Sequence, residues 1–160
     1  LAHATDRLTW KKRLSRLMNY PGSRYTQQMM EKTIYPAMQE VAKELELRDG
    51  RVTLESVEAD ESNPIGYLDL RVHLGEEQDF IYQVWPQQYS IPGFTYRARS
   101  GKSTYYRLET FLMEGSQGND LMDYSKEQVI IDILDQYERH LNFIHLNREA
   151  PGSNISFPSA

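Results

Sequence analysis

The sequence contains no cysteine and no long hydrophobic segment. The first absence excludes disulfide bonds and thiolate zinc sites, and it agrees with a reducing, cytoplasm-like environment. A helix that spans a bilayer needs about 20 predominantly apolar residues, and no segment of this chain approaches that. Residues 1–13 also lack the apolar core of a signal peptide. We therefore expect a soluble chain without a membrane span.

Acidic side chains are missing from one long stretch. Residues 80–108 contain no Asp or Glu, although the chain has 23 acidic and 18 basic residues and a net charge of −5. Net charge is positive in 1–47 and 80–108 and negative in 48–79 and 109–160. We interpret these blocks as surfaces that face one another after folding. The acidic balance argues against nucleic-acid binding.

The length of 160 residues and the hydrophobic content of 39% are typical of one domain with a single core. We assign residues 1–146 to this domain. Residues 147–160, with two prolines, one glycine and three serines, are predicted to form a flexible tail. The chain begins at Leu1 rather than at methionine, so we expect it to be a piece of a longer protein.

The first helix is predicted within residues 1–19. Trp10, Leu14, Leu17 and Met18 recur at helical spacing and form an apolar stripe. Such a helix either packs against its own domain or lies on a bilayer surface. Basic residues surround the stripe: Arg7, Lys11, Lys12, Arg13 and Arg16.

Two longer helices are predicted. One begins at Ser23 as N-cap and continues to about Leu47, and Pro36 either kinks it or restarts it. The other begins after Ser125, which forms a capping box with Gln128, and presents a wide apolar face along the C-terminal part of the domain.

Alternating apolar residues predict four strands near 52–54, 68–74, 80–85 and 104–113. Pro86 is expected to end the third strand, and residues 115–124 are predicted to form a polar loop. The fold class is therefore α+β: an antiparallel sheet of about four strands, packed by two N-terminal helices and one long C-terminal helix.

No motif in the chain indicates catalysis, a metal site or a cofactor. Gly101, Lys102 and Ser103 match the end of a phosphate-binding loop, but Tyr96 stands where that motif needs glycine. His140 and His145 lie five residues apart, whereas zinc-binding helices place two histidines four apart. We therefore predict no enzyme activity, no cofactor and no metal.

The connection from Pro86 to Ser103 is the best candidate for an interaction surface within the aromatic region. An aromatic box for a quaternary ammonium ion is disfavoured, because the neighbouring basic residues repel a cation and attract an anion. The alternative is that the aromatic residues fill the core. The candidate residues in this part of the chain are Tyr89, Phe94, Tyr96, Arg97, Arg99 and Lys102.

Two stretches carry a family resemblance: Trp85-Pro-Gln-Gln-Tyr-Ser-Ile-Pro-Gly-Phe with the residues up to Leu112, and Glu114-Gly-Ser-Gln-Gly-Asn-Asp-Leu-Met-Asp-Tyr. They resemble the C-terminal cytoplasmic extension of bacterial choline transporters in the betaine/carnitine/choline transporter family. Met18-Asn-Tyr-Pro-Gly and Tyr137-Glu-Arg-His-Leu extend the resemblance over nearly the whole chain.

The resemblance implies a regulatory domain on the cytoplasmic face of the bacterial inner membrane. Its partner would be the membrane-embedded transporter core of the same polypeptide, with anionic lipid headgroups as a further partner, and choline would bind to that core and not to this chain. Such extensions are associated with osmotic regulation. The alternative is a sensing domain for a small anionic metabolite, bound by the loop that contains Arg97 and Arg99.

Overall fold

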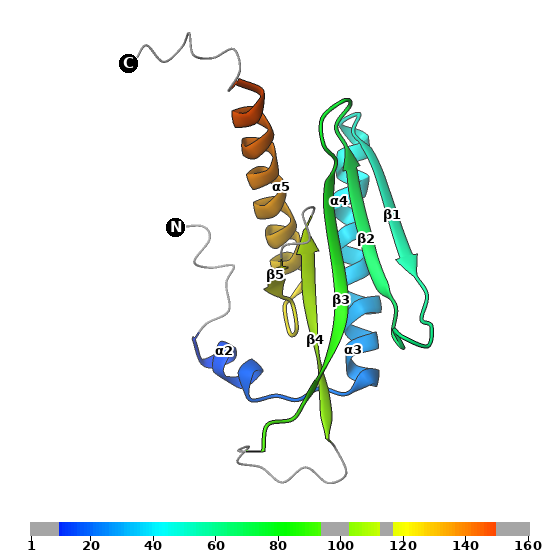
Figure 1. Ribbon diagram of the computed structural model, residues 1–160, viewed down its shortest axis with the longest axis vertical. Coiled ribbons are helices and arrows are strands. Elements are labelled where there is room, and N and C mark those ends of the chain that lie inside the picture. Colours follow the sequence, from blue (N-terminus) through cyan, green and yellow to red (C-terminus); the bar gives the residue numbers. More distant parts are fainter. Residues whose placement is uncertain (1–9, 94–102, 113–116, 150–160) are drawn as a thin grey trace.

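The computed structural model describes residues 10–93, 103–112 and 117–149. They form a five-stranded antiparallel sheet in which the strands lie side by side in chain order (Figure 1). The α+β class predicted from the sequence is confirmed. The strands are β1 (Arg51–Val57), β2 (Tyr67–His73), β3 (Phe80–Ser90), β4 (Thr104–Leu112) and β5 (Gln117–Asp120).

The predicted number of strands was one too low. β5 was assigned to a loop because its sequence, Gln-Gly-Asn-Asp, has no alternating apolar residues. The strand instead forms through its neighbour: it pairs with β4 across an irregular register, and Gly118 lies where a side chain would collide with the Thr110 hydroxyl. A glycine is therefore required for β5 to approach β4 this closely.

The helices are α2 (Trp10–Leu17), α3 (Ser23–Met29), the π-helical segment η1 (Met30–Ile34), α4 (Tyr35–Leu47) and α5 (Lys126–Glu149). The three middle segments follow one another without a break, and Pro36 lies in the first turn of α4, which is one of the two positions that the sequence left open for it. The π turn ends at Ile34, two residues before the proline, and the Tyr35 amide donates to the Met30 carbonyl. A widened turn is a known way to accommodate a proline within a helix.

β3 does not end at Pro86, as the sequence predicted, but continues to Ser90. β2 pairs with β3 only as far as Val84, so β4 is the one strand that pairs beside Pro86 in the described part of the chain. Opposite Pro86, the Leu108 amide and carbonyl both bond on the β5 side. Pro86 and Leu108 thus form a non-hydrogen-bonded pair, and the missing N–H of the proline costs no ladder bond.

The core lies between one face of the sheet and the helices. In β2 and β3 the residues at alternate positions are buried against α4 and α5, which cover the same face in Figure 1, and in β4 residues 106–110 are all buried. Tyr82 is fully buried within this core, and its hydroxyl donates to Asp132 of α5. The side-chain amide of Asn119 donates to the same carboxylate at 2.5 Å, so one buried group joins β3, β5 and α5.

Of the two helix N-termini predicted from the sequence, that of α5 is confirmed and that of α3 is wrong by one residue. The capping box at α5 is confirmed: the Gln128 amide donates to the Ser125 hydroxyl, and the Gln128 side chain accepts from the Ser125 amide. The N-cap of α3 is Gly22 and not Ser23, and no side chain caps this end. α5 runs to Glu149, so residues 147–149, which the sequence assigned to the tail, belong to the helix.

Within the described residues, no helix is both long and apolar enough to cross a membrane.

Candidate interaction surface

The apolar stripe of α2 faces away from the domain. Trp10 is 71% exposed, and Leu14, Leu17 and Met18 are each close to half exposed. None of the residues in α2 is buried. Of the two readings that the sequence left open, packing of this stripe against the domain is therefore wrong.

The opposite side of α2 is attached to the sheet through charged groups. Arg16 lies on the far side of the helix from the stripe, and its Nη1 atom contacts Asp120 Oδ2 at 2.5 Å. The Arg107 guanidinium lies 3.4 Å from the same carboxylate and also donates to the Arg16 carbonyl. We call Arg16, Arg107 and Asp120 the charged joint. It orients α2 with its polar side inward.

Asp120 is the centre of the charged joint. Its Oδ1 atom accepts from the backbone amides of Leu108 and Met122, and its Oδ2 atom accepts from Arg16 and forms an ion pair with Arg107. The side chains of Arg16, Arg107 and Asp120 are between 10 and 20% exposed. Two guanidinium nitrogens, Arg16 Nε and Arg107 Nη1, are buried without a hydrogen-bond partner. The joint is therefore largely desolvated and incompletely satisfied.

The predicted basic surface divides into two groups. Lys11, Lys12 and Arg13 are exposed, and Lys11 lies 5.6 Å from the centre of the Trp10 ring. Arg16 does not belong to this exposed group, because Asp120 holds it against the sheet. From the sequence, a basic residue opposite an apolar stripe is expected to face solvent. The inward orientation of Arg16 was therefore not predictable from spacing alone.

Tyr89 has a structural contact within its predicted surface. It is 40% exposed, and its hydroxyl donates to Glu109, which raises the pKa of Tyr89 to about 12. Its ring packs against that of Tyr105, which also contacts Tyr20 and Arg107. Other candidates lie outside the described residues, so the anion-sensing alternative stays a prediction: Arg7, Phe94, Tyr96, Arg97, Arg99 and Lys102.

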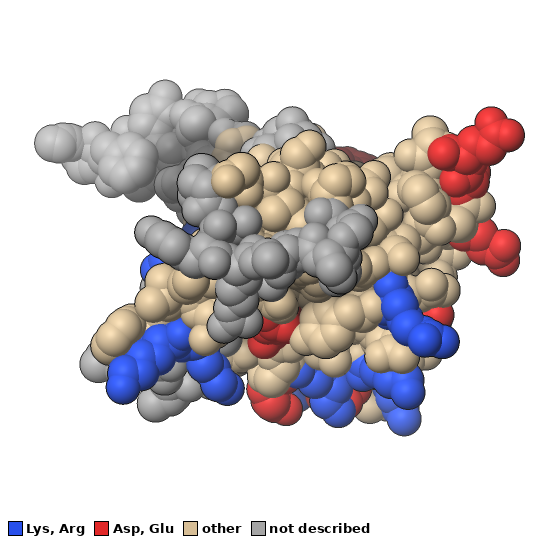
Figure 2. Space-filling model, turned by 90° about the horizontal axis from the view of Figure 1, so that it is seen from below, with Lys and Arg blue, Asp and Glu red and all other residues tan. Residues whose placement is uncertain are grey.

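Three of the four charged blocks of the sequence, 1–47, 80–108 and 109–160, meet in the fold. The basic N-terminal and central blocks meet the acidic C-terminal block at the charged joint, and Lys126 of α5 forms an ion pair with Glu40 of α4. Viewed from the lower end of the molecule, Lys and Arg side chains lie along one edge with Asp and Glu side chains among them (Figure 2). Charges of both signs are therefore mixed on this end.

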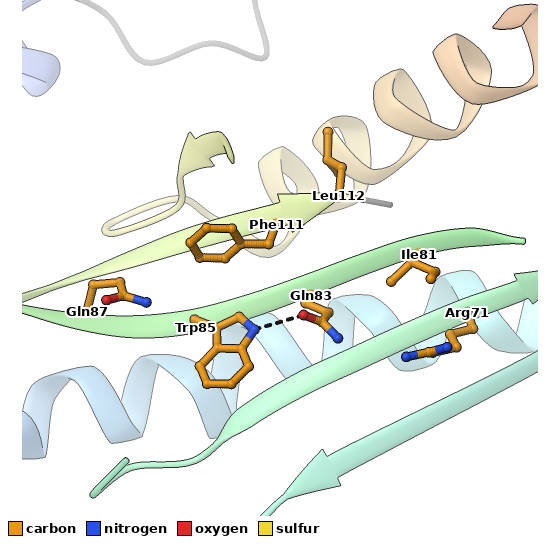
Figure 3. Close-up of a pocket in the computed structure, with 7 residues that line it drawn as sticks. All are labelled: Arg71, Ile81, Gln83, Trp85, Gln87, Phe111 and Leu112. Carbon is orange, nitrogen blue, oxygen red and sulfur yellow. Dashed lines mark hydrogen bonds between the residues drawn. The ribbon is translucent and has the colours of Figure 1, made fainter. Parts of the chain in front are cut away.

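A shallow hollow on the open face of the sheet was missed by the sequence. Its volume is about 450 Å³, and it lies on the side opposite the helices (Figure 3). Trp85 stacks on Tyr67 with ring centres 3.8 Å apart and donates to Gln83, which donates to Asp69. The lining residues are Arg71, Ile81, Gln83, Trp85, Gln87, Phe111 and Leu112.

Two of the histidines that the structure describes, His73 and His140, have structural contacts. The Nε2 atom of His140 lies 2.9 Å from the Gln78 carbonyl, and its ring packs beside Phe80. His73 lies 3.0 Å from Asp79. Among the residues that the structure describes, no group of three or more His, Asp or Glu side chains is arranged to hold a metal ion.

Comparison with known proteins supports the family resemblance. The chain is 76% identical over 155 residues to the high-affinity choline transport protein of Escherichia coli K12, a match that covers 97% of the chain and 23% of that protein. The chain is similar to part of a choline transporter. It is also 52% identical over 153 residues to the osmo-dependent choline transporter BetT2 of Acinetobacter baylyi, covering 96% of the chain and 22% of that protein.

A more distant transporter shows the same partial coverage. The glycine betaine transporter of Acinetobacter baylyi is 32% identical over 148 residues, or 91% of the chain and 21% of its own length. The chain thus spans less than a quarter of the relatives it matches. No protein-family model matches the chain.

Proposed function

We propose that this chain is a non-catalytic cytoplasmic regulatory domain of a secondary active choline transporter, and that it adjusts uptake to osmotic conditions. Similarity to segments of choline transporters supports the connection to transport. The observation that supports the regulatory role is the orientation of α2 on the domain. When the polar side of a helix is attached to its domain and the apolar side is exposed, the apolar side is a candidate contact surface for another protein or a membrane.

The partner of α2 in this proposal is the anionic surface of the membrane, next to the transporter core. Trp10, Leu14 and Leu17 would enter the boundary between headgroups and acyl chains. Lys11, Lys12 and Arg13 would attract the headgroups, and each basic residue contributes about 1 kcal/mol near an anionic surface. Together these side chains give a contact that depends on both apolar burial and charge.

Rising ionic strength weakens the charge interactions of the exposed side of α2 more than those of the side that faces the sheet. Exposed charges are screened over about 8 to 10 Å at physiological salt, whereas partly buried pairs are screened much less. The side chains of Arg16 and Asp120 are only 13 and 20% exposed. Rising salt after water loss therefore weakens the contact of α2 with lipid before it weakens the charged joint. The helix leaves the membrane still attached to its sheet.

The regulation would be allosteric. Choline binds outside this chain, so release of the domain changes transport through a coupling free energy and not through contacts with the substrate. Couplings of this kind are typically about 1 to 3 kcal/mol, enough to change an equilibrium by a factor of roughly 5 to 150.

The test is choline uptake by cells across an osmolarity series. We expect that deleting the segment equivalent to residues 1–160 flattens the response, and that K11Q/K12Q/R13Q shifts it to lower osmolarity. The control is Arg139→Gln, which removes an exposed charge from α5 and leaves α2 unchanged. If the truncated transporter follows the same osmolarity curve as the intact one, the domain does not regulate uptake.

A further inference from the structure

The strand β1 forms one edge of the sheet and is open along its outer side (Figure 1). Seven consecutive residues, Arg51 to Val57, pair with β2 in unbroken register. No backbone hydrogen bond outside the β2 ladder is formed by these residues with any other described part of the chain. The outer side of β1 therefore presents unpaired backbone groups to solvent.

The register identifies which groups these are. Leu108 bonds toward β5, so Trp85 and Glu109 form a hydrogen-bonded pair between β3 and β4. Alternation across β3 and β2 then makes Arg51 and Thr53 hydrogen-bonded partners of β2. The amides and carbonyls of the alternate β1 residues consequently point outward: Val52, Leu54 and Ser56.

The two edges of the sheet differ in how they are protected. β5 has only four residues, its register is irregular, and the Asp120 side chain binds the Leu108 backbone beside it. β1 is longer and has no proline and no bulge. Open edges of this kind are normally blocked, because they can add a strand from another chain.

The side chains of β1 are complementary to those of a second, antiparallel copy. Arg51, Thr53 and Glu55 are exposed on the face opposite the core. A two-fold axis at Thr53 places Arg51 opposite the partner's Glu55, and Glu55 opposite the partner's Arg51. The same register sets the outward amide and carbonyl of Val52 against those of the partner's Leu54. Backbone pairing and charge pairing thus agree in one register.

We propose that β1 is a self-association surface and that two copies of this chain join through antiparallel β1 strands into one continuous sheet. The interface is isologous, since the same strand serves both copies. Both copies of α4 lie on the same side of the joined sheet, because the axis is perpendicular to it. The proposal is independent of the contact between α2 and the membrane.

Charge reversal tests the pairing. Arg51→Glu and Glu55→Arg each place like charges opposite each other in the homodimer, and we expect each to weaken dimerisation about tenfold or more. The double variant R51E/E55R restores both pairs and the dimer. Mixing the two single variants also restores them, as a heterodimer. Because these side chains are exposed, the variants leave the fold intact.

The measurement is sedimentation equilibrium of the full 160-residue chain from roughly 10 to 500 µM, a range suited to a small interface. Glu138→Arg, which makes the same charge change on α5, is the control and should dimerise like the parent chain. A chain that stays monomeric throughout, or a dimer that neither reversal weakens, overturns the proposal. Loss of the dimer in both single variants without rescue on mixing also overturns it.

Discussion

At the scale of single residues, Asp120 is notable because its carboxylate contacts four polar groups. One carboxylate accepts from two backbone amides at the junction of β4 and β5 and forms ion pairs with the two arginines that hold α2. Removing one partner of a buried pair is far more damaging than the net strength of the pair suggests, because the other charges stay buried. The arrangement makes Asp120 the residue on which both the sheet edge and α2 depend.

We expect Asp120→Ala to lower the free energy of unfolding by about 2 to 4 kcal/mol, because it leaves Arg16 and Arg107 buried without an anion. Asp120→Asn keeps an acceptor for the two amides and should cost about half as much. Urea denaturation of both variants measures the difference. If Asp120→Ala unfolds at the same urea concentration as the parent, the charged joint does not stabilise the domain.

Asp132 gives a prediction about pH. Burial raises the pKa of Asp132, an effect only partly offset by the hydrogen bonds from Tyr82 and Asn119. The folded pKa therefore lies above the unfolded value of about 3.9. The stability that Asp132 contributes is therefore fully present below the unfolded pKa of about 3.9, and it is lost as the pH rises through the folded pKa.

In Asp132→Asn the titration is absent, and the amide can still bond to Tyr82 and Asn119. We expect the parent chain to lose stability relative to Asp132→Asn as pH is raised from about 4 toward neutrality. Urea titrations at a series of pH values test this. A difference between the two proteins that does not change with pH would contradict it.

At the scale of elements, strong local signals were sufficient for prediction. α5 followed from its capping box and wide apolar face, and the first four strands followed from their alternation. β5 and the second half of β3 were missed, because they depend on partners and not on their own sequence. Pro86 is tolerated only because its nitrogen faces an unpaired side, a fact that requires the register of three strands.

The two serines near helix starts provide a matched pair. Ser125→Ala removes the hydroxyl that accepts from the Gln128 amide and should cost about 1 kcal/mol. Ser23→Ala should change stability by less than about 0.5 kcal/mol, because Ser23 makes no capping bond. Thermal or urea unfolding of both variants distinguishes them. If the two substitutions lower the free energy of unfolding equally, the capping bond of Ser125 does not stabilise α5.

At the scale of the whole molecule, the sequence predicted an amphipathic first helix but not the way it is mounted. Spacing identifies the two sides of α2, whereas the inward side is chosen by Asp120, more than 100 residues later in the chain. The open-face hollow was likewise unpredictable, since Trp85 and Phe111 come from different strands. Sites that depend on pairing between distant segments carry little local signal.

Binding to vesicles tests the outward stripe. We expect the chain to sediment with vesicles of anionic lipid, and Leu17→Gln to weaken this about tenfold, since burial of one leucine contributes about 1.5 to 3 kcal/mol. Leu47→Gln is the control, because Leu47 is even more exposed but lies on α4. Equal effects of the two substitutions would mean that lipid binding, if present, does not involve α2.

The strand order of the sheet also bears on how the domain is made. Each strand lies beside the one that precedes it in the chain, so every strand emerging from the ribosome finds its partner already synthesised. The fifth strand and α5 come last, and α5 carries Asp132, whose contacts reach back 50 residues to Tyr82. Synthesis can therefore extend the sheet one strand at a time, and the last helix completes the core.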